Sequence, residues 1–139
     1  MKSKKPILLV EDDKVDVMTT QRALKDLKVL NQLNVAGNGE EALAFLRDEK
    51  NEKPCVILLD LNMPRMNGIE FLRVAKNDDQ LKIFPVVVLT TSKEERDKIE
   101  SFHLGVAGYM LKPVDYHQFV EVIRAIDLYW TLSELPECN

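Results

Sequence analysis

Five short apolar runs alternate with amphipathic stretches, and this alternation limits the fold more than any other feature of the sequence. The apolar runs cover residues 6–10, 33–36, 55–59, 85–89 and 107–111. The stretches that follow them, with apolar residues at helical spacing, cover residues 14–28, 39–47, 67–76, 94–104 and 115–130. Because runs of Ile, Leu and Val without polar alternation are typical of strands buried on both faces, the pattern predicts an α/β fold with a helix-covered parallel sheet.

The number of these units selects among the folds with parallel sheets. A closed barrel needs eight units and about 250 residues, whereas this chain has 139 residues. Right-handed crossovers then predict an open, doubly wound sheet of five strands in the order 2-1-3-4-5, with five helices in three layers. We expect one domain over residues 5–128 and a short C-terminal tail over residues 129–139.

Charge and composition argue against several classes of function. With 19 basic and 23 acidic residues the formal net charge is −4, which would repel the phosphates of DNA or RNA. The apolar runs are far shorter than the roughly 20 residues of a membrane span, and no signal peptide is recognisable. Cys55 and Cys138 form no CxxC pair, so neither a disulfide framework nor a zinc site is expected. These features predict a cytoplasmic protein.

Polar residues follow four of the five expected strands directly, and open α/β sheets bind their ligands at the carboxyl ends of strands. These residues are Glu11, Asp12 and Asp13 after the first strand, Asp60 after the third, Thr90 after the fourth and Lys112 after the fifth. Neighbouring carboxylates raise one another's pKa unless a cation neutralises them. A site made only of oxygen ligands favours Mg²⁺, and a bound Mg²⁺ indicates phosphoryl chemistry.

A carboxylate nucleophile that forms an aspartyl phosphate is an established covalent strategy, and Asp60 is the candidate for it. Lys112 can pair with phosphoryl oxygens or with the carboxylate, and the Thr90 hydroxyl can donate a hydrogen bond to a phosphoryl oxygen. Taken alone, Asp12 or Asp13 could cap the next helix, Asp60 could belong to a turn, Thr90 could end a strand and Lys112 could be solvated. Their joint placement at four strand ends favours a common site.

Four segments carry a resemblance to a known family: residues 7–13, 56–68, 86–90 and 108–113. In order and spacing they resemble the receiver domain of two-component response regulators, from about Lys5 to Leu128. The resemblance implies a flavodoxin-like fold with the strand order given above, and a phosphoacceptor signalling protein rather than an enzyme. The residues that it places in the site are Asp60 as phosphoacceptor, Asp12 as direct Mg²⁺ ligand, Glu11 as an acid acting through water, and Asn62 as donor of a backbone carbonyl to the metal.

The same resemblance implies a conformational switch. Thr90 takes the role of the switch hydroxyl, Lys112 pairs with the phosphoryl group, and Tyr109 is the aromatic residue whose ring turns inward on activation. Asp13 lies just past the acidic pair and is expected to begin a helix. Pro113 corresponds to a Lys-Pro junction, at which a cis peptide bond is common in the family.

Most family members add an output domain, and we expect none here. The segments 38–43 and 130–133 resemble the small regulators that partner phytochrome-type histidine kinases. A histidine kinase is therefore the expected donor, with Val17, Met18 and Gln21 near its docking surface. A downstream protein or a histidine phosphotransfer protein is the expected receiver of the signal. A homodimer can form through the face of segments 94–104, 107–111 and 115–130, which would include Phe102, Tyr116, Phe119 and Tyr129, although Phe119 can equally pack in the core.

Three alternatives stay open. The chain can serve as a phosphorelay shuttle, or as a pseudo-receiver that never takes a phosphoryl group, although pseudo-receivers usually lack the acids present here. An aspartyl-phosphate phosphatase of the haloacid-dehalogenase type needs a second aspartate two residues after the nucleophile, and this chain has Asn62 there.

Overall fold

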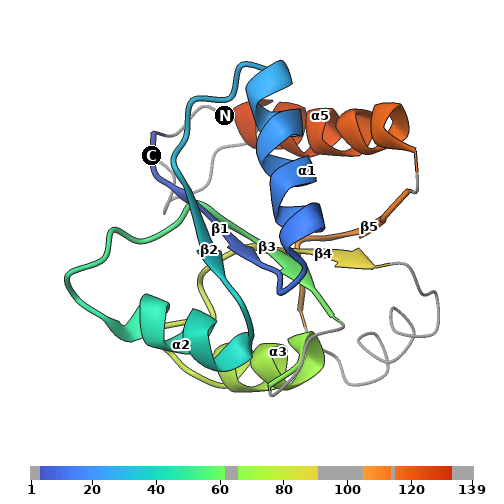
Figure 1. The fold of residues 1–139 in the computed structure, drawn as a ribbon. Helices are drawn as coiled ribbons and strands as arrows, with labels where there is room; N and C mark the ends of the chain where they lie inside the picture. The colour runs from blue at the N-terminus through green and yellow to red at the C-terminus, as the bar shows by residue number, and fades with distance from the viewer. Residues whose placement is uncertain (1–3, 62–65, 91–104, 114, 133–139) are drawn as a thin grey trace.

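A five-stranded parallel sheet forms the centre of the molecule (Figure 1). The computed structural model describes residues 4–61, 66–90, 105–113 and 115–132. Its strands are β1 (Ile7–Val10), β2 (Leu33–Ala36), β3 (Val56–Asp60), β4 (Val86–Thr90) and β5 (Gly108–Leu111). They pair in parallel in the order β2-β1-β3-β4-β5, which confirms the predicted topology.

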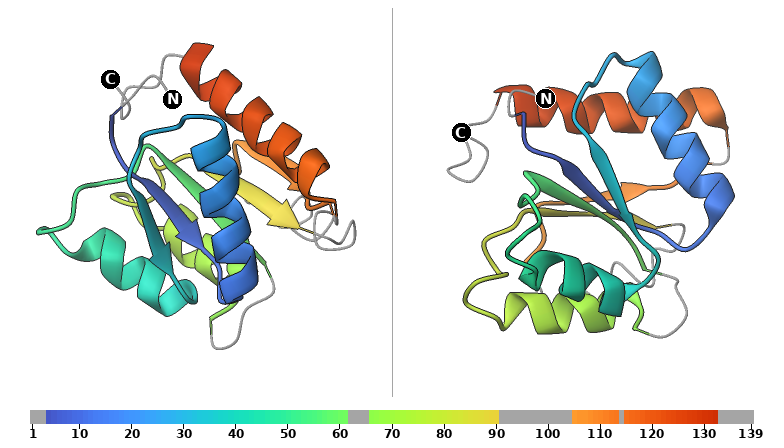
Figure 2. Two further views of the ribbon diagram at one scale, coloured as in Figure 1. Left: turned by 45° about the horizontal axis from the view of Figure 1, so that its top comes forward. Right: turned by 60° about the vertical axis from the view of Figure 1, so that its left-hand side comes forward.

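Helices cover both faces of the sheet (Figure 2). α1 (Lys14–Asp26) and α5 (Tyr116–Leu132) lie on one face, and α2 (Gly39–Arg47) and α3 (Gly68–Lys76) lie on the other. The helix expected over residues 94–104 lies outside the described residues. α5 continues to Leu132, so Trp130 belongs to this helix and not to a tail that begins at residue 129. Residues 129–132 contain no glycine or proline, so the sequence has no helix-ending signal before Leu132.

Alternate residues of the central strands face opposite cores, as the period of a β-strand requires. Leu8 and Val10 pack with α2 and α3, whereas Ile7 and Leu9 pack with α1 and α5. β2 is different because it lies at the edge of the sheet, where Val35 is 45% exposed. The prediction that every strand is buried on both faces was therefore wrong for β2.

Close backbone contacts hold the N-termini of α2 and α3 beside the C-terminal end of β3. The Gly68 N–H donates to the Leu61 carbonyl at 3.1 Å, and the Gly39 N–H donates to the Met66 carbonyl at 2.8 Å. A Cβ on Gly68 would lie 2.7 Å from the Asp60 carbonyl oxygen and 2.7 Å from the Leu61 Cα. Only glycine can make this approach, so Gly68 helps to position the backbone of Asp60.

We predict that Gly68→Ala lowers the free energy of unfolding by about 1–3 kcal/mol, because the added methyl group forces backbone atoms apart. Urea denaturation measures this change. Gly108→Ala is the matched control, since a Cβ there meets no heavy atom within 4 Å among the described residues. Equal stability of both variants would contradict the positioning role of Gly68.

Candidate functional site

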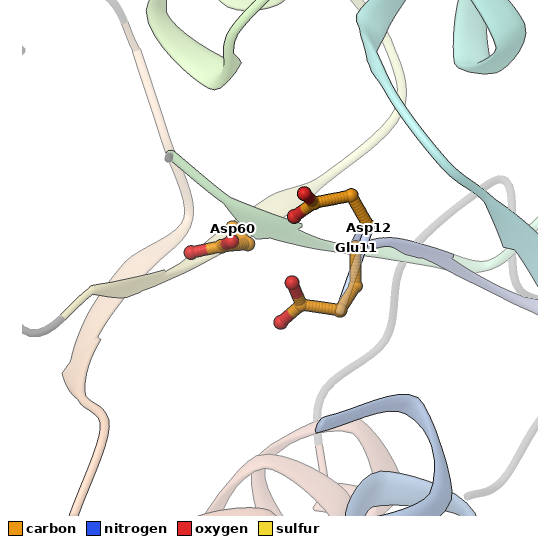
Figure 3. A group of neighbouring side chains, drawn as sticks. All are labelled: Glu11, Asp12 and Asp60. Atoms are coloured by element: carbon orange, nitrogen blue, oxygen red, sulfur yellow. The ribbon is translucent and has the colours of Figure 1, made fainter. Parts of the chain in front are cut away.

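Three carboxylates converge at the carboxyl ends of β1 and β3 (Figure 3). Glu11 and Asp12 directly follow β1, and Asp60 is the last residue of β3. The register pairs Val10 with Leu59, so Glu11 and Asp60 come next along two neighbouring strands. One ligand oxygen from each of the three side chains lies within 4.8 Å of the others. The structure thus brings together the three acids that the strand ends indicated.

Glu11 is the buried member of this group, with 4% of its surface exposed. Its Oε1 accepts a hydrogen bond from Lys112 Nζ at 2.7 Å, and its Oε2 accepts one from the Asp13 N–H at 3.3 Å. The pKa of Glu11 is raised to about 7. Burial is the largest cause and Asp60 contributes in the same direction, whereas the hydrogen bond from Lys112 acts to lower it. Glu11 therefore has less positive charge near it than a fully ionised carboxylate at this depth requires.

The arrangement fits a divalent cation. Clustered carboxylate oxygens are the ligands that Mg²⁺ and Mn²⁺ prefer, and Asp12 is exposed and therefore accessible to an incoming ion. Both Glu11 oxygens already accept hydrogen bonds from the protein. This leaves the exposed Asp12 better placed than Glu11 for direct coordination. Asn62, whose carbonyl was expected to contribute, lies outside the described residues.

Lys112 follows β5 and reaches across to the acids. Its side chain is 13% exposed, and Nζ lies 2.7 Å from Glu11 Oε1 and 2.7 Å from Asp16 Oδ2. Burial acts to lower the pKa of Lys112, but the hydrogen bonds to Asp16 and Glu11 outweigh it and the pKa is raised. Lys112 is therefore a stable cation within the acidic group.

Sequence reasoning missed Asp16, which lies in the first turn of α1. The available signal was its spacing from Asp13, because an acid three residues after a helix cap lies in the turn nearest the strand end. Asp13 itself caps α1, as expected: its side chain accepts hydrogen bonds from the N–H groups of Val15 and Asp16.

Thr90 and Tyr109 lie on the strands expected for them. Thr90 ends β4, beside β3, in a register that pairs Asp60 with Leu89. Tyr109 lies on β5, is half-buried and packs against the core on the α2 and α3 side. The described part of the chain contains no cis peptide bond, so the bond between Lys112 and Pro113 is trans.

An open pocket of about 700 Å³ extends from the acids along the groove between α1 and α5. Arg22 lies over the Tyr116 ring, 4.2 Å from its centroid, and the Tyr116 hydroxyl donates to Asp26 at 2.6 Å. Phe119 is 3% exposed in the core between these helices. Phe119 therefore packs in the core, which is the alternative given for it, and Tyr116 contacts α1. Phe102 and the Tyr129 side chain lie outside the described residues, so the dimer face stays a prediction.

Two exposed apolar side chains lie on the N-terminal half of α1. Val15 is 68% exposed and Met18 is 66% exposed. Val17, which was expected near the docking surface, packs against the core and is only half-exposed. Among the described residues, no helix combines the length and the apolar character that crossing a membrane would require.

We predict an unusual pH dependence of stability in the absence of divalent metal. The folded protein holds the Glu11 proton up to pH about 7, whereas the group's ordinary pKa is 4.5. The folded state therefore binds more protons between these values, and this group's contribution to the free energy of unfolding falls as pH rises from 4.5 toward 7. Urea denaturation in EDTA at about pH 5 and about pH 8 measures the effect.

Glu11→Gln removes this titration, so the variant should gain stability relative to the original protein as the pH rises. A difference in unfolding free energy that stays constant between the two pH values would contradict the raised pKa.

Comparison with known proteins assigns the family. The sequence model of the response regulator receiver domain matches residues 7–124. The response regulator Rcp1 of Synechocystis sp. is 39% identical over 130 residues, which cover 91% of this chain and 88% of Rcp1.

Two solved structures are similar over nearly the whole chain. The phosphorylated cyanobacterial phytochrome response regulator RcpA is 39% identical, with a TM-score of 0.85, and the match covers 96% of this chain and 99% of RcpA. The Mn²⁺-bound form of Rcp1 is 39% identical, with a TM-score of 0.84, and the match covers 95% of this chain and 99% of Rcp1. With its flavodoxin-like sheet and its acidic group at the strand ends, this chain belongs to the receiver domain family of two-component response regulators.

Proposed function

We propose that this chain is a response regulator that accepts a phosphoryl group on Asp60 from a histidine kinase and thereby changes a protein-interaction face. The observation that carries the proposal is the grouping of Glu11, Asp12 and Asp60 within 4.8 Å of one another, with Lys112 bound to Glu11. A receiver domain that retains both the acids and the lysine has the groups that phosphoryl transfer requires.

The chemistry follows from what each side chain offers. A carboxylate oxygen of Asp60 attacks the phosphorus of a phosphohistidine, and the P–N bond breaks. The electron pair of that bond goes to the ring nitrogen, and the imidazole leaves neutral because its other nitrogen carries a proton. Asp12 and Asp60 would hold Mg²⁺ directly, with Glu11 acting through water and the Asn62 carbonyl as a further ligand. Bound Mg²⁺ supplies positive charge against the phosphoryl oxygens. Lys112 pairs with one of these oxygens, and the Thr90 hydroxyl donates to another.

Phosphorylation then alters the surface beside β5. It adds about −1.5 to −2 charges and three strong acceptors next to β4, which draw Thr90 toward Asp60. Tyr109 turns inward into the space released. Its position supports this role, because a half-buried side chain on β5 can change orientation without leaving the core. The protein is then a two-state element that one phosphoryl group biases.

The relatives and the α1 surface together suggest the partners. RcpA is a phytochrome response regulator, so we infer a phytochrome-type histidine kinase as donor, acting in the cytoplasm. Exposed Val15 and Met18 provide apolar contact beside the acids for the donor's helices. A downstream protein or a histidine phosphotransfer protein receives the signal. We also propose homodimerisation through the face of residues 94–104, β5 and α5, which light scattering with and without a phosphoryl mimic tests.

We predict that Asp60→Asn abolishes Mg²⁺-dependent phosphorylation by acetyl phosphate, because an amide cannot form the acyl phosphate. Mass spectrometry of the intact protein measures the added group. Asp79→Asn is the matched control, since the Asp79 side chain is 92% exposed in another part of the chain and should leave labelling unchanged. Labelling of Asp60→Asn at the original level would contradict the assignment, and a protein unlabelled before any substitution would favour a pseudo-receiver.

A further inference from the structure

Lys112 binds a second carboxylate that the proposed reaction does not use. Asp16 Oδ2 lies 2.7 Å from Lys112 Nζ, at the same distance as Glu11 Oε1. The two acceptors come from different elements, since Glu11 follows β1 and Asp16 lies in α1. Of the interactions that raise the pKa of Lys112, the hydrogen bond to Asp16 is the largest and the charge of Asp60 is the smallest. The resting ammonium is thus in direct contact with a carboxylate of α1 as well as with Glu11.

The first turn of α1 fixes Asp16 in this position. The Asp13 side chain caps the helix, with Oδ1 accepting from the Val15 N–H at 2.8 Å and from the Asp16 N–H at 3.4 Å. The positive end of the helix dipole also favours a carboxylate in the first turn. Asp16 is therefore a placed counter-ion for Lys112, although its side chain is 38% exposed.

The contact between Asp16 and Lys112 matters because the pocket contains few positive charges. Among the described residues, five acidic and two basic side chains line the pocket. A phosphoryl group on Asp60 adds about −1.5 to −2 charges and needs a cation. An ammonium has three N–H groups, and two of those on Lys112 already serve carboxylates. Pairing with the phosphoryl group draws Lys112 toward β3 and away from α1.

We propose that Asp16 is a positioning residue that holds Lys112 in its resting place and competes with the phosphoryl group for it. This inference rests on the proposed function of Asp60. Asp16 then shifts the equilibrium toward the unphosphorylated state, because it binds Lys112 in that state and not in the phosphorylated one. Removing the charge of Asp16 lowers the cost of moving Lys112 and stabilises the phosphorylated arrangement.

The test uses beryllofluoride, a phosphoryl mimic, with Mg²⁺ and the full chain. Isothermal titration calorimetry should show Asp16→Asn binding beryllofluoride about fivefold more tightly, an effect typical of a half-exposed ion pair. Glu40→Gln is the matched control, because Glu40 is an exposed acid in the first turn of α2 and its loss should change affinity by less than about twofold. Unchanged or weaker binding by Asp16→Asn would overturn the inference.

The same substitution in a Lys112→Met background separates competition from simple repulsion between Asp16 and the anion. The gain should disappear there, and a gain that persists in full would overturn the inference. A crystal structure of the beryllofluoride complex provides a second measurement. Lys112 Nζ should lie beyond hydrogen-bond distance of Asp16, and a contact still at 2.7 Å would contradict the competition. Failure of the unsubstituted protein to bind beryllofluoride would instead contradict the proposed function of Asp60.

Discussion

The parallel pairing of β1 with β3 is the constraint on which the site depends. Their register aligns Val10 with Leu59, so the next residues, Glu11 and Asp60, end two adjacent strands at the same edge of the sheet. A slip of one residue would turn the side chains of a strand to the opposite face. Apolar packing on both faces prevents such a slip, because Leu8 and Val10 fill one core while Ile7 and Leu9 fill the other. The core therefore determines where the carboxylates meet.

This placement brings negative charges close together, and their repulsion favours the binding of a cation. The pKa of Glu11 is raised to about 7, chiefly by burial and also by Asp60, although Lys112 opposes the shift. A cation that binds here relieves repulsion that the fold has already imposed. The Lys112 ammonium supplies part of the relief, and its contacts with Glu11 and Asp16 join β1, β5 and α1. A change of charge on Asp60 would thus be felt by three elements at once.

Much of this architecture is readable from local pattern. The strands could be predicted because Ile, Leu and Val runs have few alternatives to a buried parallel sheet, and the site acids could be predicted because they follow those runs directly. The contact between Asp16 and Lys112 could not be, since it joins residues 96 positions apart and depends on how α1 packs. The exposure of Val35 depends on which strand lies at the edge. The orientation of Tyr116 depends on Arg22 and Asp26, which lie on another helix.

Mapping the phosphorylated residue tests the role of Asp60 as phosphoacceptor. After incubation with acetyl phosphate and Mg²⁺, borohydride reduces an aspartyl phosphate to homoserine, which peptide mass spectrometry can locate in the chain. We expect homoserine at position 60 when Mg²⁺ is present and none there after chelation. Homoserine at another position, or an unchanged aspartate at position 60 under these conditions, would contradict that role.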